Sequence, residues 1–312
     1  MRRSRIEAMP QYAVFRGGSK TYFNSSVFFP EAVRRDVFIL YGFVRTADDF
    51  VDATPQDACG FASFCQAWER AEAGMPAGDP IIDDFVELSG RRGFEESWTR
   101  AFLASMAADL ETVAFDRLEQ TLAYIYGSAE VIGLFMSRIL DLPDAALPHA
   151  RMLGRAMQYI NFLRDIAEDN GLGRRYLPLG NSGLADLSEA EARSKPEVFT
   201  AWFRDQSALY RTWHAEGERG YGYIPRRYLL PIRTAEDMYL WTAGVLEADP
   251  FIVYERQVKP PRRRIRRTAL ANIFAPVSRR NIPPVPDAVT GGLEEPVVED
   301  FAFVHADCGE DA

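Results

Sequence analysis

Apolar residues recur every three or four positions along most of the chain, as they do on the buried faces of α-helices. This pattern predicts helices over residues 30–53, 58–73, 80–89, 93–111, 116–140, 145–170, 188–219 and 227–249. Pro30 suits the first turn of the first helix, and Pro55 follows its end. No stretch alternates apolar and polar residues between turn residues, so we expect no strands. We therefore predict an all-α fold in a single domain.

The charge of the chain is distributed unevenly, which sets the domain boundary. The 312 residues are 47% hydrophobic, enough to bury a large core, and carry a net charge of −9. Residues 281–312 hold eight acidic residues and no Lys or Arg, so the rest of the chain is close to neutral at −1. We predict one folded domain over residues 1–280 and an acidic, disordered tail over residues 281–312.

Two groups of polar residues interrupt apolar helical stretches, about a hundred residues apart. In the first, Asp48 and Asp52 share a helix face and Arg45 lies one turn before them. The second repeats this spacing with Gln158, Asn161, Asp165 and Asp169. Carboxylates in an apolar setting repel one another unless a cation lies between them, and Mg²⁺ binds through a few carboxylates and substrate phosphates. We expect the two groups to form facing walls of a cavity that holds Mg²⁺.

A solvated helix face is the simpler explanation of one aspartate-rich stretch. Here apolar residues such as Val44, Phe50 and Ile166 surround the acids, which indicates buried helices whose acids need partners. Asp49 is left out of the metal set, because an ion pair with Arg45 explains it as well. Glu130 stands alone in an apolar turn, and we expect a buried arginine to pair with it.

Four segments of the chain resemble the squalene/phytoene synthase family, the head-to-head prenyl diphosphate synthases. They are SKTY at 19–22, LYGFVRTADDFVD at 40–52, YIYGSAEVIG at 124–133 and GRAMQYINFLRDIAEDNGLGRRYLP at 154–178. The resemblance spans about residues 15–270. It implies an all-α isoprenoid-synthase bundle around a central apolar cavity. It also implies a prenyltransferase that joins two prenyl diphosphates through a cyclopropylcarbinyl diphosphate, with Mg²⁺ or Mn²⁺ as the cofactor.

The resemblance further implies roles for individual residues. The implied metal ligands are Asp48, Asp52, Asn161, Asp165 and Asp169. The implied catalytic residues are Asp48, Asp52, Asp165, Asp169 and Tyr239. The implied substrate-binding residues are Ser19, Lys20, Tyr22, Tyr41, Arg45, Tyr126, Gln158, Arg164 and Arg256. Arginine suits diphosphate because its planar head binds two oxygens at once, and a neutral Asn can ligate a metal without adding charge.

Other residues have two open interpretations at this stage. Arg174, Arg175 and Arg264 could bind phosphate or pair with an acid. Aromatic side chains could line an apolar cavity that keeps a carbocation from water, or belong to the ordinary core. This second set comprises Tyr22, Tyr41, Phe43, Tyr124, Tyr126, Phe135 and Phe162.

The small residues Ser25 and Ser26 favour a deep pocket and therefore a C20 substrate. We expect two geranylgeranyl diphosphates to give phytoene through prephytoene diphosphate, in carotenoid biosynthesis. The alternative is the same chemistry on farnesyl diphosphate, which would give presqualene diphosphate, dehydrosqualene or squalene, with NADPH needed only for squalene. An alternative of another class is a non-catalytic helical scaffold protein, against which the two intact acidic groups argue.

Location and partners follow from charge and hydropathy. No run of about 18 apolar residues occurs, and the N-terminus lacks the apolar core of a signal peptide, so we expect a cytoplasmic protein. The basic segment 256–267 could rest on anionic lipid at the inner face of the membrane, or face diphosphate or the acidic tail. No nucleic-acid partner is expected, because the body lacks an extended basic surface.

Overall fold

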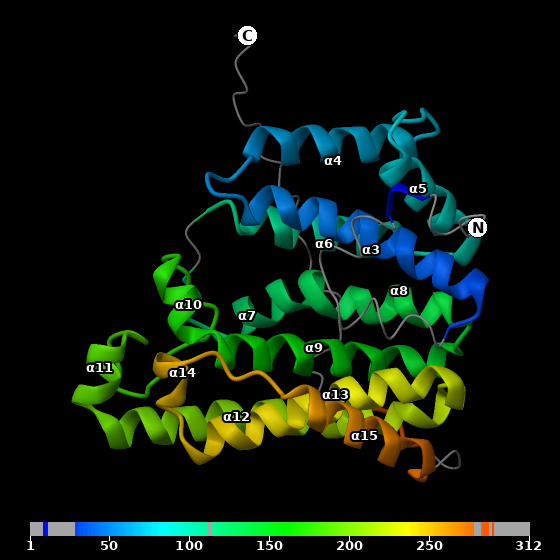
Figure 1. Ribbon diagram of the computed structural model, residues 1–312. Coiled ribbons are helices and arrows are strands. Elements are labelled where there is room, and N and C mark those ends of the chain that lie inside the picture. The colour runs from blue at the N-terminus through cyan, green and yellow to red at the C-terminus, as the bar shows by residue number, and fades with distance from the viewer. Residues whose placement is uncertain (1–8, 12–28, 112–113, 278–281, 287–288, 290–312) are drawn as a thin grey trace. The chain divides into compact units, whose positions relative to one another are not determined.

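The computed structural model describes residues 9–11, 29–111, 114–277, 282–286 and 289 (Figure 1). These residues form helices and turns, and the only bridge of the β type among them joins Ala114 to Arg175. The predicted all-α class is therefore confirmed for the described chain. No helix in these ranges is long and apolar enough to span a bilayer.

The chain divides into two compact units. Unit 1 comprises residues 1–111, 135–141 and 297–312, and unit 2 comprises residues 112–134 and 142–296. The single domain over 1–280 therefore stays a prediction. The tail over 281–312 also stays a prediction, since most of it lies outside the described residues.

Unit 1 is built from four helices and the end of a fifth. They are α3 (Glu31–Asp52), α4 (Ala58–Glu72), α5 (Pro80–Arg92), α6 (Glu96–Ala108) and the last turns of α8 (Val131–Ile139). The apolar face of α3 packs against α4, α5 and α6. At its centre Phe43 is fully buried and stacks on Phe85, with the ring centroids 3.8 Å apart. Phe135 of α8 lies edge-on to Trp98. Phe43 and Phe135 are therefore core residues of this unit.

Local signals explain where these helices begin and end. Asp57 caps α4 by accepting a hydrogen bond from the Gly60 amide at 2.8 Å. Asp79 does the same for α5, whose first residue is Pro80. Gly93 ends α5 in the left-handed conformation, with φ of 66°.

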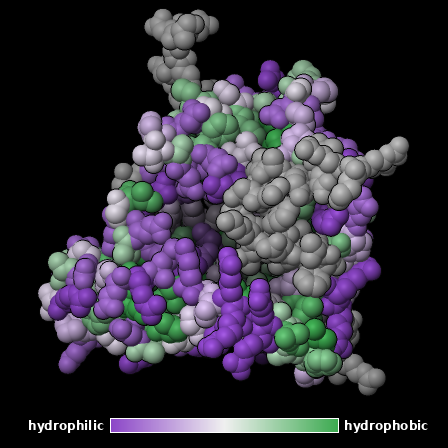
Figure 2. Space-filling model, viewed as in Figure 1, coloured by the Kyte–Doolittle hydropathy of each residue, from purple (hydrophilic) through white to green (hydrophobic). Residues whose placement is uncertain are grey.

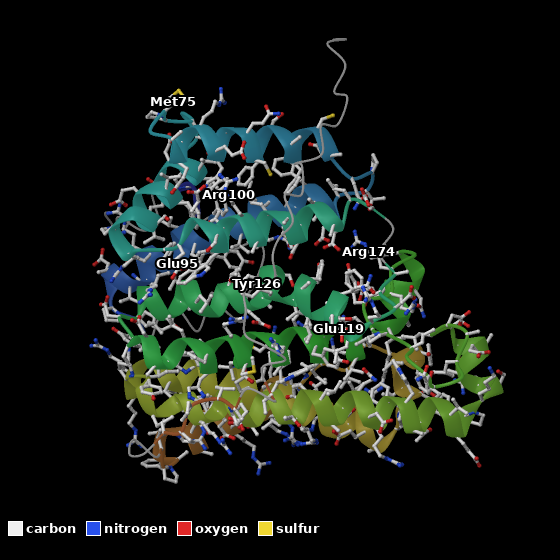
Figure 3. All side chains as sticks on the ribbon, turned by 180° about the vertical axis from the view of Figure 1, so that it is seen from behind. Met75, Glu95, Arg100, Glu119, Tyr126 and Arg174 are labelled. Carbon is white, nitrogen blue, oxygen red and sulfur yellow. The ribbon has the colours of Figure 1, made fainter. Side chains whose placement is uncertain are left out.

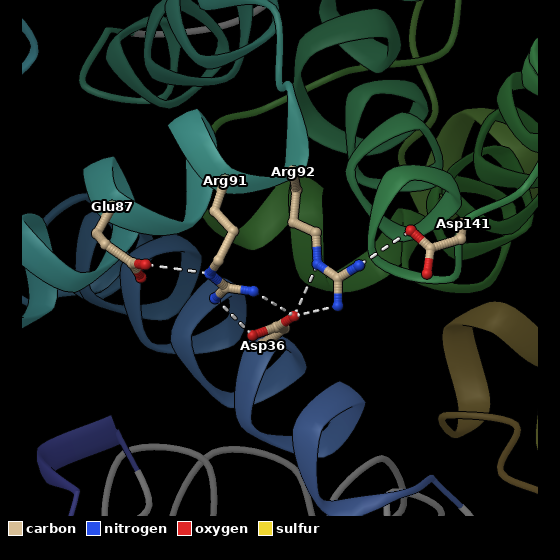
Figure 4. Close-up of polar contacts among 5 residues, drawn as sticks. All are labelled: Asp36, Glu87, Arg91, Arg92 and Asp141. Atoms are coloured by element: carbon tan, nitrogen blue, oxygen red, sulfur yellow. Dashed lines mark hydrogen bonds and ion pairs between the residues drawn. The ribbon is translucent and has the colours of Figure 1, made fainter.

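A buried carboxylate, Asp36, fixes α3 to the end of α5 (Figure 4). Its side chain is 3% exposed and accepts two hydrogen bonds from Arg91, at 2.8 and 3.1 Å, and two from Arg92, at 2.6 and 2.8 Å. Glu87 and Asp141 bind the outer sides of the two guanidinium groups, each at 3.0 Å. Burial alone would raise the pKa of Asp36, but the hydrogen bonds and charges of the arginines outweigh it and lower that pKa.

We expect Asp36→Asn to lower the free energy of unfolding at about pH 7 by about 3 kcal/mol, because two guanidinium groups lose their shared carboxylate. A carboxyl whose pKa is lowered by folding stabilises the fold above its unfolded pKa and ceases to do so as the pH falls through its folded pKa. The difference between the two proteins in urea unfolding should therefore shrink below about pH 4. Glu87→Gln, which alters an exposed partner of Arg91, is the control and should cost less than about 1 kcal/mol. Equal losses for both variants would contradict the assignment.

Unit 2 contains the remaining helices, with α9 at its centre. They are α7 (Leu118–Ile125), the π-helical turn η3 (Tyr126–Glu130), the first turn of α8, η4 (Asp144–Ala146), α9 (Leu147–Arg164), α10 (Ile166–Gly171), α11 (Glu189–Ser194), α12 (Pro196–Arg219), η5 (Gly220–Tyr223), α13 (Arg226–Ala248), α14 (Ile252–Glu255) and α15 (Arg262–Phe274). Helix α9 packs against η3, α12 and α13. Two glycines allow the backbone of α9 to lie close to η3 and to the first turn of α8. A Cβ on Gly154 would lie 2.5 Å from the Ala129 carbonyl oxygen, and a Cβ on Gly133 would lie 2.5 Å from the Ala150 carbonyl oxygen, which is too close for either side chain.

Three predicted helices are less regular than expected. The helix predicted over 116–140 contains the π turn at Tyr126–Glu130, which Figure 3 locates through the labelled Tyr126. The helix predicted over 145–170 is interrupted at Asp165, and that over 188–219 at Lys195. A π turn inserts one extra residue and rotates the side chains that follow it. Here the last residue of the π turn, Glu130, contacts α9.

That acid, Glu130, is completely buried and binds two arginines of α9. Its carboxylate oxygens lie 2.8 Å from Arg151 Nε and 2.6 Å from Arg155 Nε. The guanidinium of Arg151 lies 4.8 Å from the centre of the Tyr126 ring, and that of Arg155 lies 5.4 Å from that of Trp213. The predicted pairing of Glu130 with a buried arginine is confirmed, with two arginines instead of one.

Candidate active site

The last turns of α3 gather three carboxylates around one guanidinium in unit 1. Arg45 lies 2.5 Å from an oxygen of Asp48, 2.5 Å from one of Asp49 and 4.0 Å from one of Asp52. The predicted ion pair between Arg45 and Asp49 is therefore present. Arg45 also pairs with Asp48. One positive charge among three negative ones leaves this group with an excess of negative charge.

The electrostatics of this group show the effect of that excess. Burial and the neighbouring Asp52 carboxylate raise the pKa of Asp48 to about 6, although Arg45 opposes the shift. Burial also raises the pKa of Tyr41, one turn before Arg45 on α3. The ionised form of Asp48 is therefore disfavoured, because burial and the Asp52 carboxylate together outweigh the single positive charge of Arg45. A cation bound beside Asp48 would add positive charge there.

In unit 2, the second group continues across the break between α9 and α10. Asp165 leaves regular helical geometry, with φ of −102° and ψ of 16°. Its amide still donates to the Asn161 carbonyl at 2.9 Å, and the Asp169 amide donates to the Asp165 carbonyl at 2.9 Å. The three residues therefore keep their one-turn spacing, although the prediction of one continuous helix was wrong at Asp165. Gln158 lies one turn before Asn161 and is half-buried.

The side chains of Arg164 and Gln257 both bind Asp165. Arg164 binds it through two parallel contacts, Nε to Oδ1 at 2.8 Å and Nη2 to Oδ2 at 2.5 Å. Gln257, which follows α14, donates to Asp165 Oδ1 at 3.0 Å and to Glu168 Oε2 at 3.3 Å. Burial would lower the pKa of Arg164, but Asp165 outweighs it and raises that pKa, with a contribution from Tyr239. Tyr239 of α13 therefore lies close enough to Arg164 to contribute to the shift of its pKa.

The polar oxygens of both groups suit a hard divalent cation. Asn161 Oδ1 is buried and accepts no hydrogen bond from any described residue, which is the state expected of an oxygen reserved for a ligand. No three or more His, Cys, Asp or Glu side chains converge to hold a metal by themselves within the described ranges. Mg²⁺ keeps several waters and uses one or two carboxylates plus substrate phosphates, so an incomplete protein shell of oxygens fits it.

Aromatic rings pack beside the second group. Phe162, next to Asn161 in α9, stacks on Tyr176 with centroids 4.4 Å apart, and Tyr124 lies 5.0 Å from Tyr176. All three rings are buried. Two of the predicted wall residues, Tyr124 and Phe162, thus belong to one aromatic cluster in unit 2. Tyr126 lies elsewhere in this unit, under Arg151.

The structure distinguishes the remaining predicted residues. Arg256 is exposed at the end of α14. Arg175 donates to Asp116 at 2.8 Å and to the Phe115 and Leu177 carbonyl oxygens, so its contacts hold the local chain together. Arg174, labelled in Figure 3, follows α10. Five predicted residues lie outside the described ranges: Ser19, Lys20, Tyr22, Ser25 and Ser26.

Sequence reasoning assigned no role to three residues that the structure places here. Gln257 binds Asp165 from ninety-two positions further along the chain, and nothing local marks it as a partner. Glu168 shares that glutamine but is exposed. The sequence did point to Tyr176, because this residue lies in the RRYLP segment at the end of the second motif.

Both acidic groups lie on or next to helices of a chain whose described residues form an all-α fold. The squalene/phytoene synthase family matches residues 15–265, and the chain belongs to that family. The family is one of prenyltransferases, so the chain is an enzyme that performs the phytoene- or squalene-synthase type of condensation. The alternative of a non-catalytic scaffold is therefore set aside.

The chain is similar to several named relatives. It is 29% identical over 239 residues to a 15-cis-phytoene synthase of Enterobacter agglomerans, which covers 71% of this chain and 80% of that protein. It is 28% identical over 261 residues to a 15-cis-phytoene synthase of Synechocystis sp., covering 78% and 77%. It is 32% identical over 180 residues to a presqualene diphosphate synthase of Rhodopseudomonas palustris, covering 55% and 64%.

Solved structures share the fold. The squalene synthase HpnC from Alicyclobacillus acidocaldarius superposes with a TM-score of 0.69 at 20% identity, over 77% of this chain and 93% of that one. A dehydrosqualene synthase crystallised with a ligand gives a TM-score of 0.69 at 17% identity, over 84% and 93%. At these identities the likeness establishes the isoprenoid-synthase type of helical fold.

Proposed function

We propose that the chain condenses two molecules of geranylgeranyl diphosphate head to head, through prephytoene diphosphate, to phytoene, in carotenoid biosynthesis. The observation that carries this proposal is the same in both units: carboxylates lie in contact with an arginine, Arg45 with Asp48 and Arg164 with Asp165. These residues stand at the positions of the family's two aspartate-rich motifs. The named phytoene synthases among the relatives support the C20 substrate.

In this proposal each acidic group binds the metal cofactor. Asp48 and Asp52 in unit 1 would hold Mg²⁺ or Mn²⁺, and so would Asn161, Asp165 and Asp169 in unit 2. The metal would neutralise pyrophosphate as it leaves the allylic carbon. The buried Asn161 oxygen and the raised pKa of Asp48 support these two residues as ligands.

The arginines and Tyr239 would position the diphosphates. Arg45 and Arg164 each present a planar head beside carboxylates, and such a head can turn its second edge to phosphate oxygens. Tyr239, close to Arg164, would donate a hydrogen bond near the reacting carbon. Gln158 lies one turn before Asn161, and Tyr41 lies one turn before Arg45. Both side chains would contact phosphate oxygens or the waters bound to them. Residues outside the described ranges keep the substrate-binding roles that the resemblance implies.

The reaction then proceeds in two ionisations. The C1–O bond of one substrate breaks and releases pyrophosphate, and the allylic cation bonds to the C2–C3 double bond of the other substrate. Loss of a proton from C1 of the ionised substrate then closes the cyclopropane of prephytoene diphosphate, and the remaining diphosphate stays on C1 of the other substrate. Departure of the second pyrophosphate, rearrangement and a final proton loss to pyrophosphate give phytoene, with no reductant. The buried rings of Tyr124, Phe162 and Tyr176 would exclude water from the cation.

A second candidate uses the same residues with farnesyl diphosphate. It is favoured by the 32% identity to a presqualene diphosphate synthase over 180 residues. Its products would be presqualene diphosphate, dehydrosqualene or, with NADPH, squalene. The pocket-length argument from Ser25 and Ser26 stays a prediction from the sequence.

Product analysis separates the two candidates. The purified protein would be incubated with geranylgeranyl or farnesyl diphosphate, with Mg²⁺ or with EDTA, and with or without NADPH, and the extracted lipids resolved by chromatography. We expect phytoene from the C20 substrate, in amounts independent of NADPH, and no product with EDTA. Consumption of the C15 substrate alone would overturn the C20 assignment, and turnover in EDTA would overturn the metal assignment.

A further inference from the structure

Helix α15 is held on unit 2 by one of its faces. Ile265, Thr268 and Asn272 lie at positions i, i+3 and i+7 and are half-buried. Asn272 Nδ2 donates to Asp237 Oδ2 of α13 at 2.6 Å. Arg226 donates to the Ile273 carbonyl oxygen, again from α13. The orientation of α15 is therefore set by packing and hydrogen bonds to α13, which decide which side chains point outward.

The outward face is basic in its first turns and apolar at its end. Arg263, Arg267, Leu270 and Phe274 lie at i, i+4, i+7 and i+11, one stripe along the helix, and all are exposed. Leu270 is 64% exposed and Phe274 is 83% exposed, and the neighbouring Ile273 is 43% exposed. Figure 2 shows hydrophilic side chains projecting at the start of α15 and hydrophobic ones at its C-terminal end.

This combination is concentrated on α15. Five large apolar side chains are strongly exposed among the described residues, and three of them are the ones on this helix. From Arg256 to Phe274 the chain holds seven basic residues and no acidic one. Arg226 adds another positive charge beside the apolar end, through its bond to Ile273. Arg264 is the exception among the arginines, since its guanidinium lies 5.0 Å from the centre of the Trp241 ring of α13.

We propose that the outward face of α15 docks on the surface of a bilayer that contains anionic lipid. The arginines would bind the phosphate headgroups, while Leu270, Ile273 and Phe274 would enter the boundary of the acyl chains. A nucleic acid would attract the arginines through its phosphates but offer no apolar phase for Leu270, Ile273 and Phe274. A bilayer accounts for both halves of the face. This proposal does not rest on the proposed reaction, because it concerns a different surface and needs no substrate.

The test is flotation of the full chain with vesicles, without substrate. One set of vesicles is phosphatidylcholine alone, and the other contains about 30% phosphatidylglycerol, both in about 0.1 M salt. We expect the wild type to float with the anionic vesicles at least about tenfold more than with the neutral ones, and raising the salt to about 0.5 M to weaken this binding. Equal binding to both sets, or none to either, would overturn the proposal. Absence of binding would mean that something else covers the face, such as the acidic tail, or that its partner is not lipid.

Two double variants separate the charge from the apolar contribution. Arg263→Glu/Arg267→Glu and Leu270→Ser/Phe274→Ser should each reduce flotation with anionic vesicles at least about tenfold. The charge control is Arg70→Glu/Arg204→Glu, which reverses two exposed arginines on α4 and α12. The apolar control is Met75→Ser, which changes a side chain that is 58% exposed (Figure 3).

Both controls should float like the wild type, and circular dichroism would verify that every variant is folded. Flotation of the α15 variants at the wild-type level would overturn the proposal. An equal loss of flotation in the charge control would also overturn the proposal. It would show that binding depends on the net charge of the protein and not on the outward face of α15.

Discussion

Replacing Asp48 with alanine is expected to lower the turnover of prenyl diphosphate by about 1000-fold, equivalent to about 4 kcal/mol of transition-state stabilisation. In the proposed function Asp48 holds the cation that neutralises departing pyrophosphate. Turnover would be measured with saturating substrate and Mg²⁺, so that the loss falls on the rate constant kcat.

The same substitution should not unfold the protein. Burial and Asp52 raise the pKa of Asp48 to about 6, above its ordinary value near 4, so its ionised form is disfavoured in the folded chain. Such a group stabilises the fold only while protonated, at low pH, and that contribution disappears as the pH rises through about 6. At about pH 8 the variant should therefore be at least as resistant to urea as the wild type.

The adjacent residue provides a matched control. Asp49→Ala removes the same charge from the same turn of α3, but Asp49 is 55% exposed and its contact is the ion pair with Arg45. We expect turnover to fall less than about tenfold, since an exposed pair is worth about 1 kcal/mol or less. Equal losses in the two variants would remove the distinction drawn here between a metal ligand and an ion-pairing residue. Unchanged turnover in Asp48→Ala would remove its metal role.

The largest effect on stability is expected for Glu130→Ala, which should lower the free energy of unfolding by about 3–5 kcal/mol. Glu130 is completely buried, and its removal leaves Arg151 and Arg155 in the interior without the carboxylate that both contact. The two guanidinium groups would then repel each other, and a cavity would remain beside them. Urea unfolding followed by circular dichroism would measure the loss.

Two further variants test the cause of this loss. Glu119→Ala, on the exposed side of α7 in the same unit (Figure 3), removes an equal charge at the surface and should change stability by less than about 0.5 kcal/mol. Glu130→Gln keeps the volume and should still lose most of the stability, because a neutral amide cannot balance two positive charges. Wild-type stability in Glu130→Gln would show that shape matters at this site and charge does not.

Much of the fold could be predicted because helix patterns are local. The limits of α4 at Ala58–Glu72 and of α13 at Arg226–Ala248 fall within one residue of the predicted 58–73 and 227–249. The π turn at Tyr126–Glu130 could not be predicted, since its sequence is compatible with a regular helix. Its buried acid meets arginines more than twenty positions away, and only packing brings them together.

The candidate site divides in the same way. The spacing of Asp48 and Asp52 on one helix face is a property of the sequence, and so is the succession from Asn161 to Asp169. The distances between these residues and their partners, which decide what each residue can bind, are not determined by the sequence pattern. The contact of Gln257 with Asp165 and the buried, unsatisfied oxygen of Asn161 depend on how distant segments fold onto α9 and α10.

By itself, the sequence determined the helical class, the membership of a prenyltransferase family and the identity of the acidic residues, because each is encoded in residue types at short, regular spacing. Tertiary structure decided which acids have partners: Asp36 two arginines of α5, Glu130 two of α9, and Asp48 a crowded carboxylate neighbourhood. It also decided that Leu270 and Phe274 face solvent while Ile265 faces the protein. Burial and ion pairing are set by residues far apart in the chain, and a pattern read along the chain contains no information about which of them meet.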